Sequence, residues 1–142
     1  MNDARSEASL SFEILGALQA VASRLEAELE PLGLSLAKFG ALSRLVDAGR
    51  PLPLGTLAER CACVRSNITQ LVDRLEAERL VVRVDDPRDR RSVLAELTEQ
   101  GRVRHAAGER ALEAVERELL ARIPDDQRAA LRGLLQALGT TS

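Results

Sequence analysis

Hydrophobic positions recur at steps of three and four residues along most of this chain, which is the spacing of one face of an α-helix. Glycine and proline interrupt the pattern where helices are expected to end. The helices that this spacing predicts cover residues 11–32, 36–46, 54–60, 65–79, 98–123 and a last segment that begins after Pro124. The sequence therefore predicts a mostly α-helical protein.

The first and the longest helical segments each carry an apolar stripe. In the segment 11–32 the stripe consists of Ile14, Leu18, Val21, Leu25 and Leu29. In the segment 98–123 it consists of Val103, Ala107, Leu112, Val115 and Leu119. Both stripes are expected to pack against other helices.

Two short segments depart from the helical spacing and are rich in β-branched residues. Leu80–Val84 and Val93–Leu97 are predicted to be strands, and the residues between them, 85–92, are mostly charged. We expect a two-stranded hairpin with an exposed basic tip. The proline-rich link before residue 54 is expected to be a tight connection.

The predicted helices at 54–60 and 65–79 are joined by a short turn around residues 61–63, which is the outline of a helix-turn-helix unit. Four apolar positions of the second helix are expected to point inward, namely Ile68, Leu71, Val72 and Leu75. The opposite face carries the polar residues Ser66, Thr69, Gln70, Asp73 and Arg74. A face of hydrogen-bonding side chains suits a protein that reads a DNA groove.

Composition narrows the class of protein further. A chain of 142 residues is about one domain, and no apolar run reaches the roughly 18 residues that span a bilayer. We expect no membrane association and no secretory signal, hence a cytoplasmic protein. No nucleophile with a paired base, no phosphate-binding glycine loop and no pair of metal-binding histidines is recognisable, so we expect neither an enzyme nor a cofactor.

The net charge of −2 argues against a protein that coats nucleic acid without selectivity. Residues 64–92 form the only part of the chain with a positive balance, with seven basic and six acidic groups. An excess of one charge does not decide the matter. Any role in DNA binding must depend on where the arginines lie.

Several segments together resemble the MarR family of transcriptional regulators. They are Leu57–Arg60, Ile68–Glu76, Val82–Arg83, Asp86–Arg91 and Leu97–Gly101. The resemblance covers nearly the whole chain and implies a single domain, 1–142, with a winged helix-turn-helix lobe at about 36–97. It also implies an obligate homodimer, paired through helices at about 11–32 and 98–140, whose two lobes read successive major grooves of a pseudo-palindromic operator.

The resemblance implies a set of site residues. Those expected to contact DNA are Arg65, Ser66, Asn67, Thr69, Gln70, Arg74, Arg88, Arg90 and Arg91. Residues of the helix would contact base edges or phosphates, with Arg74 on a flanking phosphate. Arg90 and Arg91 would enter the minor groove, and Asp89 would hold a wing arginine in place.

Three departures from the family pattern concern the recognition helix. Arg79 replaces the usual glycine after this helix, so a residue with a side chain is expected to adopt a left-handed conformation. Val64 stands where a serine cap is common. Cys61 and Cys63 stand at turn positions that are commonly leucine and valine.

Two interpretations of Cys61 and Cys63 stay open. Free cysteines pack as small hydrophobic side chains, so both can belong to the core. Alternatively, they form a redox or metal sensor, with nearby positive charge from Arg60 and Arg65 or with His105 and a carboxylate as further ligands. His105 itself is expected at the surface or in an interface.

The function expected from the sequence is therefore that of a sequence-specific DNA-binding regulator, a homodimeric repressor that a small-molecule effector releases. The alternative is a thiol-based redox or metal sensor that acts through Cys61 and Cys63. Expected partners are double-stranded DNA, a second copy of the chain and a small-molecule effector. A third interpretation is a helical dimerisation protein without a DNA function.

Overall fold

The computed structural model describes residues 2–61 and 65–139, with side chains for 9–61 and 67–139. The helices are α1 (Asn2–Leu29), α2 (Leu36–Ala48), α3 (Leu54–Arg60), α4 (Arg65–Ala77), α5 (Glu99–Arg122) and α6 (Asp125–Gly139), with a 3-10 turn at Glu30–Leu32. The strands are β1 (Leu52–Pro53), β2 (Val81–Asp86) and β3 (Asp89–Leu97). The predicted fold class, mostly α with a small β-hairpin, is confirmed.

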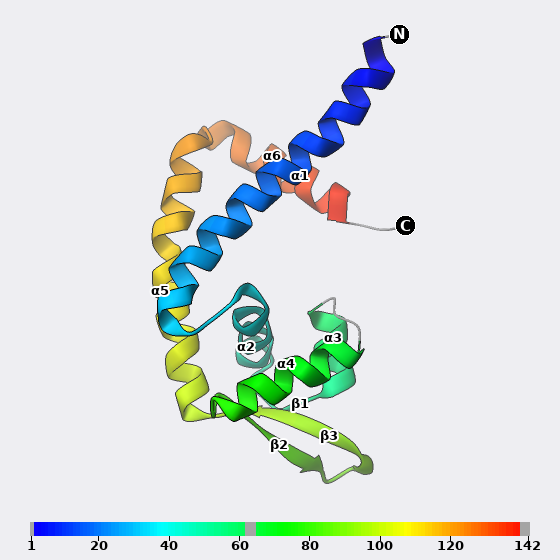
Figure 1. Cartoon of the computed structure of the whole chain (residues 1–142), viewed down its shortest axis with the longest axis vertical. Coiled ribbons are helices and arrows are strands. Elements are labelled where there is room, and N and C mark those ends of the chain that lie inside the picture. Colours follow the sequence, from blue (N-terminus) through cyan, green and yellow to red (C-terminus); the bar gives the residue numbers. More distant parts are fainter. Residues whose placement is uncertain (1, 62–64, 140–142) are drawn as a thin grey trace.

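The elements form two groups (Figure 1). Helices α2, α3 and α4 and the three strands make one lobe, which we call the winged lobe (residues 36–97). Helix α1 packs on α5, and α5 also contacts α2 of the winged lobe. The N-terminal half of α1 points away from this lobe, and α6 lies at a distance from it (Figure 1). None of the helices in the described ranges combines the length and the hydropathy needed to cross a bilayer.

The hairpin is longer than the sequence predicted. Strands β2 and β3 pair antiparallel as far as Asp86 and Asp89, with an irregularity between Asp85 and Asp86. The expected charged loop 85–92 is therefore wrong in extent, because Arg90 and Arg91 lie in β3. Charged residues are rare in strand patterns, but a hairpin that projects into solvent buries neither face near its tip.

A third strand, β1, was missed. Leu52 pairs with Ala95 and Pro53 pairs with Leu94, so the sheet has the order β1-β3-β2. The link predicted as a simple tight connection thus contributes to the sheet. A two-residue strand shows no alternation in the sequence, and it forms here because Leu52 is fully buried.

The core of the winged lobe is aliphatic. The predicted inward face of α4 is confirmed, since Ile68, Val72 and Leu75 are fully buried and Leu71 is 8% exposed. The same core includes Ala41, Leu42, Leu45, Leu52, Leu57, Ala58, Leu80, Val81 and Ala95. Burial of each large aliphatic side chain contributes about 1.5–3 kcal/mol. This packing fixes which face of α4 remains in solvent.

The predicted stripe on α5 is confirmed in part, since Val115 is buried and Leu112 packs against the core, but the buried face also includes positions outside the stripe. Val103 is 60% exposed, and the buried residues are Gly101, His105, Gly108 and Val115. Small residues are needed here because α2 lies close to α5. A Cβ atom built on Gly108 would lie 2.8 Å from the Phe39 ring.

The expectation of a surface or interface position for His105 is wrong. Its ring stacks on Phe39 at a centroid distance of 5.0 Å, and its Nε2 lies 3.0 Å from Ser43 Oγ. Ser43 Oγ already donates to the carbonyl oxygen of Phe39 at 2.8 Å. Ser43 must therefore accept from the Nε2–H of His105, so this histidine is a satisfied core residue that links α2 to α5.

The terminal helices are joined by polar contacts. Arg24 Nη2 of α1 lies 2.6 Å from Glu118 Oε2 of α5, and this hydrogen bond and the charge of Glu118 raise the pKa of Arg24 above its ordinary value. Arg104 of α5 donates to the carbonyl oxygen of Leu32 at 2.7 Å. These contacts hold the C-terminal part of α1 and the 3-10 turn that follows it against α5.

Helix α4 ends in a Schellman motif, and the left-handed conformation expected for Arg79 is confirmed at φ 61°. The N–H of Leu80 donates to Leu75 O and the N–H of Arg79 donates to Glu76 O, each at 2.9 Å. The chain thereby turns directly from α4 into β2.

The same region holds the start of α5. Thr98 caps this helix by accepting the N–H of Gly101 at 3.0 Å, and its hydroxyl oxygen lies 2.7 Å from Arg79 O and 3.0 Å from Leu80 O. A Cβ atom on Gly101 would lie 2.1 Å from Leu80 O. We call the contact of Arg79, Leu80, Thr98 and Gly101 the hinge cluster.

We predict that Gly101→Ala lowers the free energy of unfolding by about 3 kcal/mol or more, because backbone atoms rather than a flexible side chain occupy the space. Urea unfolding followed by circular dichroism measures this change. The matched control is Gly40→Ala in α2, where a Cβ atom meets nothing within 4 Å. This control should raise stability by about 0.5–1 kcal/mol, and equal stability of the two variants would contradict the packing described.

We also predict that Arg79→Gly raises the free energy of unfolding by about 0.5–1 kcal/mol, since it relieves a left-handed residue that has a Cβ atom. Thermal and urea unfolding check this. Arg79→Ala is the control, because it keeps the Cβ atom and should bring no comparable gain. A stabilising Arg79→Ala would show that the side chain, not the backbone, carries the cost.

Candidate nucleic-acid interface

The solvent face of α4 carries hydrogen-bonding side chains. Asn67, Thr69, Gln70 and Arg74 are all exposed, as expected from the sequence. Arg65 and Ser66 lie in the first turn of this helix, but their side chains fall outside the described residues. Because the opposite face of α4 is buried in the core, the helix cannot rotate, and its exposed face keeps a fixed orientation on the surface of the lobe.

Beside α4, the hairpin projects three exposed arginines, Arg88, Arg90 and Arg91. The carboxylate of Asp86 accepts the backbone N–H of Arg88, and that of Asp89 accepts the backbone N–H of Arg91, each at 2.9 Å. Asp89 was expected to hold a wing arginine, and the contact that the structure gives it is to backbone rather than to a guanidinium group. The two aspartates shape the turn.

Arg83 of β2 contacts α4 directly, and sequence reasoning did not include it among the expected site residues. Its guanidinium contacts Asp73 Oδ1 at 2.5 Å and Glu76 Oε1 at 3.1 Å, both on α4. The sequence signal was available, since Asp73 and Glu76 are one helical turn apart and Arg83 is the basic residue of the next element. Only the fold, however, places that strand beside this face of the helix.

Most acidic groups of α4 and its end are paired with basic groups. Asp73 and Glu76 contact Arg83, and Glu78 lies 2.8 Å from Nζ of Lys38. Each such half-exposed pair contributes at most about 1 kcal/mol to stability. Their larger effect is on the potential, because they leave the positive charge of Arg74 and of the hairpin less opposed.

The cysteines give no sign of a sensor in the described part of the chain. Cys61 ends α3, is partly buried and packs against the aliphatic core. Cys63 lies outside the described residues. No group of three or more His, Cys, Asp or Glu side chains within the described ranges could hold a metal ion. The thiol-sensor alternative thus receives no support here.

The sequence and the fold of this chain are similar to those of known transcriptional regulators. Residues 32–92 match the family model described as MarR family. A crystal structure of a probable transcriptional regulator from Pseudomonas aeruginosa superposes with a TM-score of 0.81 at 31% identity, covering 91% of this chain and 96% of that one. The chain belongs to the MarR family. The resemblance inferred from the sequence is confirmed, and the relatives of this MarR-family chain are transcriptional regulators rather than enzymes.

Two further relatives bear on the site. The helix-turn-helix regulator YkoM of Bacillus subtilis is 38% identical over 69 residues, which are 49% of this chain and 44% of YkoM. The match thus spans about half the length of that relative. The repressor CouR, solved bound to a 23-mer DNA duplex, is 28% identical with a TM-score of 0.86 over 92% of each chain. CouR of Rhodococcus jostii was also solved with p-coumaroyl-CoA, at 27% identity, a TM-score of 0.81 and 94% coverage of each chain.

Proposed function

We propose that this MarR-family chain is a homodimeric repressor that binds a pseudo-palindromic operator through α4 and the β2–β3 wing, and that a small-molecule effector releases it. The observation that carries the proposal is the exposed polar face of α4 next to three exposed wing arginines. The same fold is bound to a DNA duplex in the repressor CouR. The terminal helices would pair the two copies.

The side chains on α4 suit base recognition. Carboxamides such as those of Asn67 and Gln70 can form paired hydrogen bonds with adenine, and Thr69 can contact a thymine methyl group. Arg74 at the end of the helix would contact a phosphate. Arg90 and Arg91 would enter the narrow minor groove, where the negative potential is strongest.

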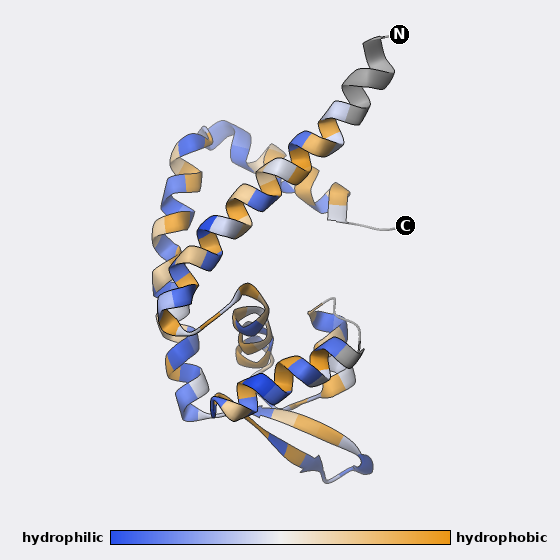
Figure 2. Ribbon diagram, in the orientation of Figure 1, coloured by the Kyte–Doolittle hydropathy of each residue, from blue (hydrophilic) through white to orange (hydrophobic). Residues whose placement is uncertain are grey.

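Exposed leucines support the homodimer. Helix α6 has 15 residues and none of them is buried, while Leu134, Leu135 and Leu138 are 63%, 53% and 61% exposed. A helix of this length is marginal in water without packing. Apolar side chains also line the free half of α1, including Leu18 at 62% exposed, and Figure 2 shows apolar residues alternating with hydrophilic ones along both helices. A second copy would cover these faces.

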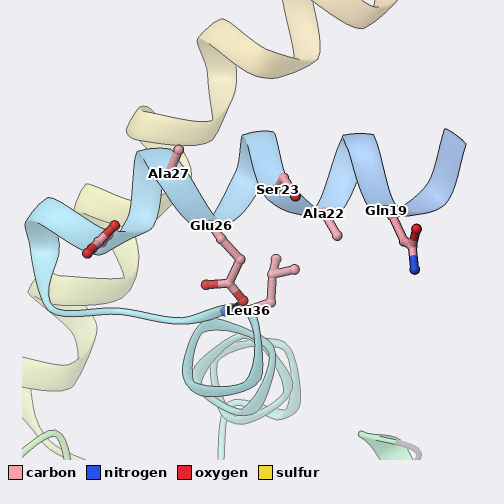
Figure 3. A pocket seen from close by; sticks show the side chains of 7 residues that line it. Gln19, Ala22, Ser23, Glu26, Ala27 and Leu36 are labelled. Carbon is pink, nitrogen blue, oxygen red and sulfur yellow. Dashed lines mark hydrogen bonds between the residues drawn. The ribbon is translucent and has the colours of Figure 1, made fainter. Parts of the chain in front are cut away.

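An open cleft of about 640 Å³ between α1 and α2 is the proposed effector site. Gln19, Ala22 and Glu26 project from the same side of α1, and Glu26 points toward Leu36 of α2 (Figure 3). Glu26 Oε1 accepts the N–H of Leu36, the first residue of α2, at 3.0 Å. A ligand that engages Glu26 would therefore act on the start of α2, and through α2 on the winged lobe.

The charge of this cleft favours neutral or cationic effectors. Glu26 and Glu30 line it, together with Ser23 and apolar side chains, and no basic residue is among the described residues of its lining. An anionic ligand would have to approach two carboxylates without a counter-charge. The ligand of CouR, an acyl-CoA, is thus a poor guide to the effector of this chain.

We predict that this protein enriches a specific duplex from a random library, and that Arg90→Ala and Arg91→Ala each weaken binding to it about tenfold. The plot of log binding constant against log salt concentration should also become less steep, by about 0.9 for each phosphate charge that the removed arginine had neutralised. Fluorescence anisotropy at several salt concentrations measures both quantities. Arg110→Ala, an exposed arginine on α5, is the control and should change neither. An unchanged salt slope in both wing variants would refute the assignment of the wing.

We predict that the protein sediments as a dimer at micromolar concentration and that the double variant Leu134→Glu, Leu138→Glu sediments as a monomer. Charges placed on an apolar interface lose hydration without a partner, which costs several kcal/mol. Gln136→Glu is the matched control on the same helix, and it should leave the dimer intact. A monomeric parent protein would rule out the proposed assembly.

A further inference from the structure

We propose that Arg83 is a positioning residue for DNA recognition, which sets the angle between the recognition helix α4 and the wing so that both reach the duplex together. This inference rests on the proposed DNA binding. It assigns to Arg83 no contact with DNA. Its action would pass through α4 and the strands.

The geometry of Arg83 is that of a clamp along one side of α4. Its Nη2 lies 2.5 Å from Asp73 Oδ1 and 3.4 Å from Thr69 O, and its Nη1 lies 3.1 Å from Glu76 Oε1. Its backbone N–H donates to the second oxygen of Glu76 at 2.9 Å. Positions 69, 73 and 76 are spaced by four and three residues, so one side chain spans two turns of the helix on a single face.

The clamp lies where the sheet loses its third strand. Arg83 pairs with Ala95 of β3, and Ala95 is also the partner of Leu52 in β1. One position further, Pro53 is the last residue of β1, and beyond it the wing is a two-stranded ribbon. Isolated two-stranded ribbons are marginally stable and bend easily. A link to α4 at this position therefore restrains the direction in which the ribbon projects.

The donors of Arg83 are directed at the protein rather than outward. Its side chain is 25% exposed, whereas Asp73, which it contacts, is 61% exposed. Both amino groups of the guanidinium engage α4. By contrast, the wing arginines 88, 90 and 91 form no ion pair with another residue in the described part of the chain. Arg83 is therefore suited to orient α4 and the wing, whereas the three wing arginines remain available to bind phosphates.

The effect of neutralising Asp73 and Glu76 on DNA affinity distinguishes a positioning role of the clamp from a simple contribution to the charge of the surface. Removing carboxylates from a DNA-binding face should strengthen DNA binding, because DNA is a polyanion. If Asp73 and Glu76 instead hold Arg83 in place, neutralising them should weaken specific binding although the lobe becomes more positive. The two expectations have opposite signs.

The test uses a duplex selected from a random library by the parent protein, with a scrambled duplex of the same composition for comparison. The variants are Arg83→Met, Arg83→Lys and the double variant Asp73→Asn, Glu76→Gln. Asp85→Asn is the matched control, since it removes an exposed carboxylate of the wing that lies outside the clamp. Anisotropy gives affinity and salt slope, and thermal unfolding shows that each variant is folded.

We expect Arg83→Met and the double acid variant each to lose about tenfold in affinity for the selected duplex, the size of one misplaced base contact, and little for the scrambled one. Arg83→Lys should recover only part, because an ammonium group cannot form the paired contacts. Asp85→Asn should bind as well as the parent or better. The backbone amides of residue 86 and residues 88–91 should exchange with solvent faster in Arg83→Met and in the double acid variant than in the parent protein, but not in Asp85→Asn.

Tighter binding by the double acid variant would overturn the inference. Equal losses on both duplexes, with a salt slope reduced by about 0.9 for each of the two copies, would also overturn it, because they indicate a direct phosphate contact. Unchanged affinity in Arg83→Met would also overturn it while leaving the proposed DNA binding intact. Failure of the parent protein to enrich any duplex would instead contradict the proposed function, and the inference with it. That outcome is seen before any variant is made.

Discussion

Burial of one face of α4 determines what the other face presents. Ile68, Val72 and Leu75 are fully enclosed by aliphatic side chains of α2, α3 and the sheet, so the helix cannot rotate about its axis without exposing them. Asn67 and Gln70 are thereby kept in solvent at fixed positions. A protein with almost no aromatic residues achieves this with leucine, isoleucine, valine and alanine alone. Base recognition needs such rigidity, since a hydrogen bond tolerates little misplacement.

The hinge cluster connects α4 to the wing strands and to α5. Within a few ångströms, the end of α4, the start of β2, the end of β3 and the start of α5 share the atoms of Arg79, Leu80, Thr98 and Gly101. A second junction, His105 against Phe39 and Ser43, joins α5 to α2. The winged lobe is therefore tied to α5 at two places. Movement of the terminal helices would reach α4 as a displacement of the whole lobe rather than as a loosening of its core.

The sequence was sufficient to predict those features whose physical cause lies within a single helix or turn. The spacing of Ile68, Leu71, Val72 and Leu75 is a property of the helix itself, and the left-handed Arg79 followed from a family position that is usually glycine. It was insufficient where the cause lies in another element. Strand β1 exists because of its pairing with Ala95, His105 is buried because Gly108 lets α2 approach, and Arg83 is recognisable only once β2 lies beside α4. The wing was placed correctly but made too short, because a solvated hairpin carries no alternation.

In the proposed homodimer, two copies of the winged lobe bind one DNA site together. Hydroxyl-radical footprinting of the selected duplex tests this arrangement most directly, because it maps the contacts of both lobes on each strand. We expect two protected segments related by a two-fold axis, with centres about one helical turn, roughly 10 base pairs, apart. We also expect protection of the minor groove beside each segment. A single protected segment without symmetry would contradict this arrangement.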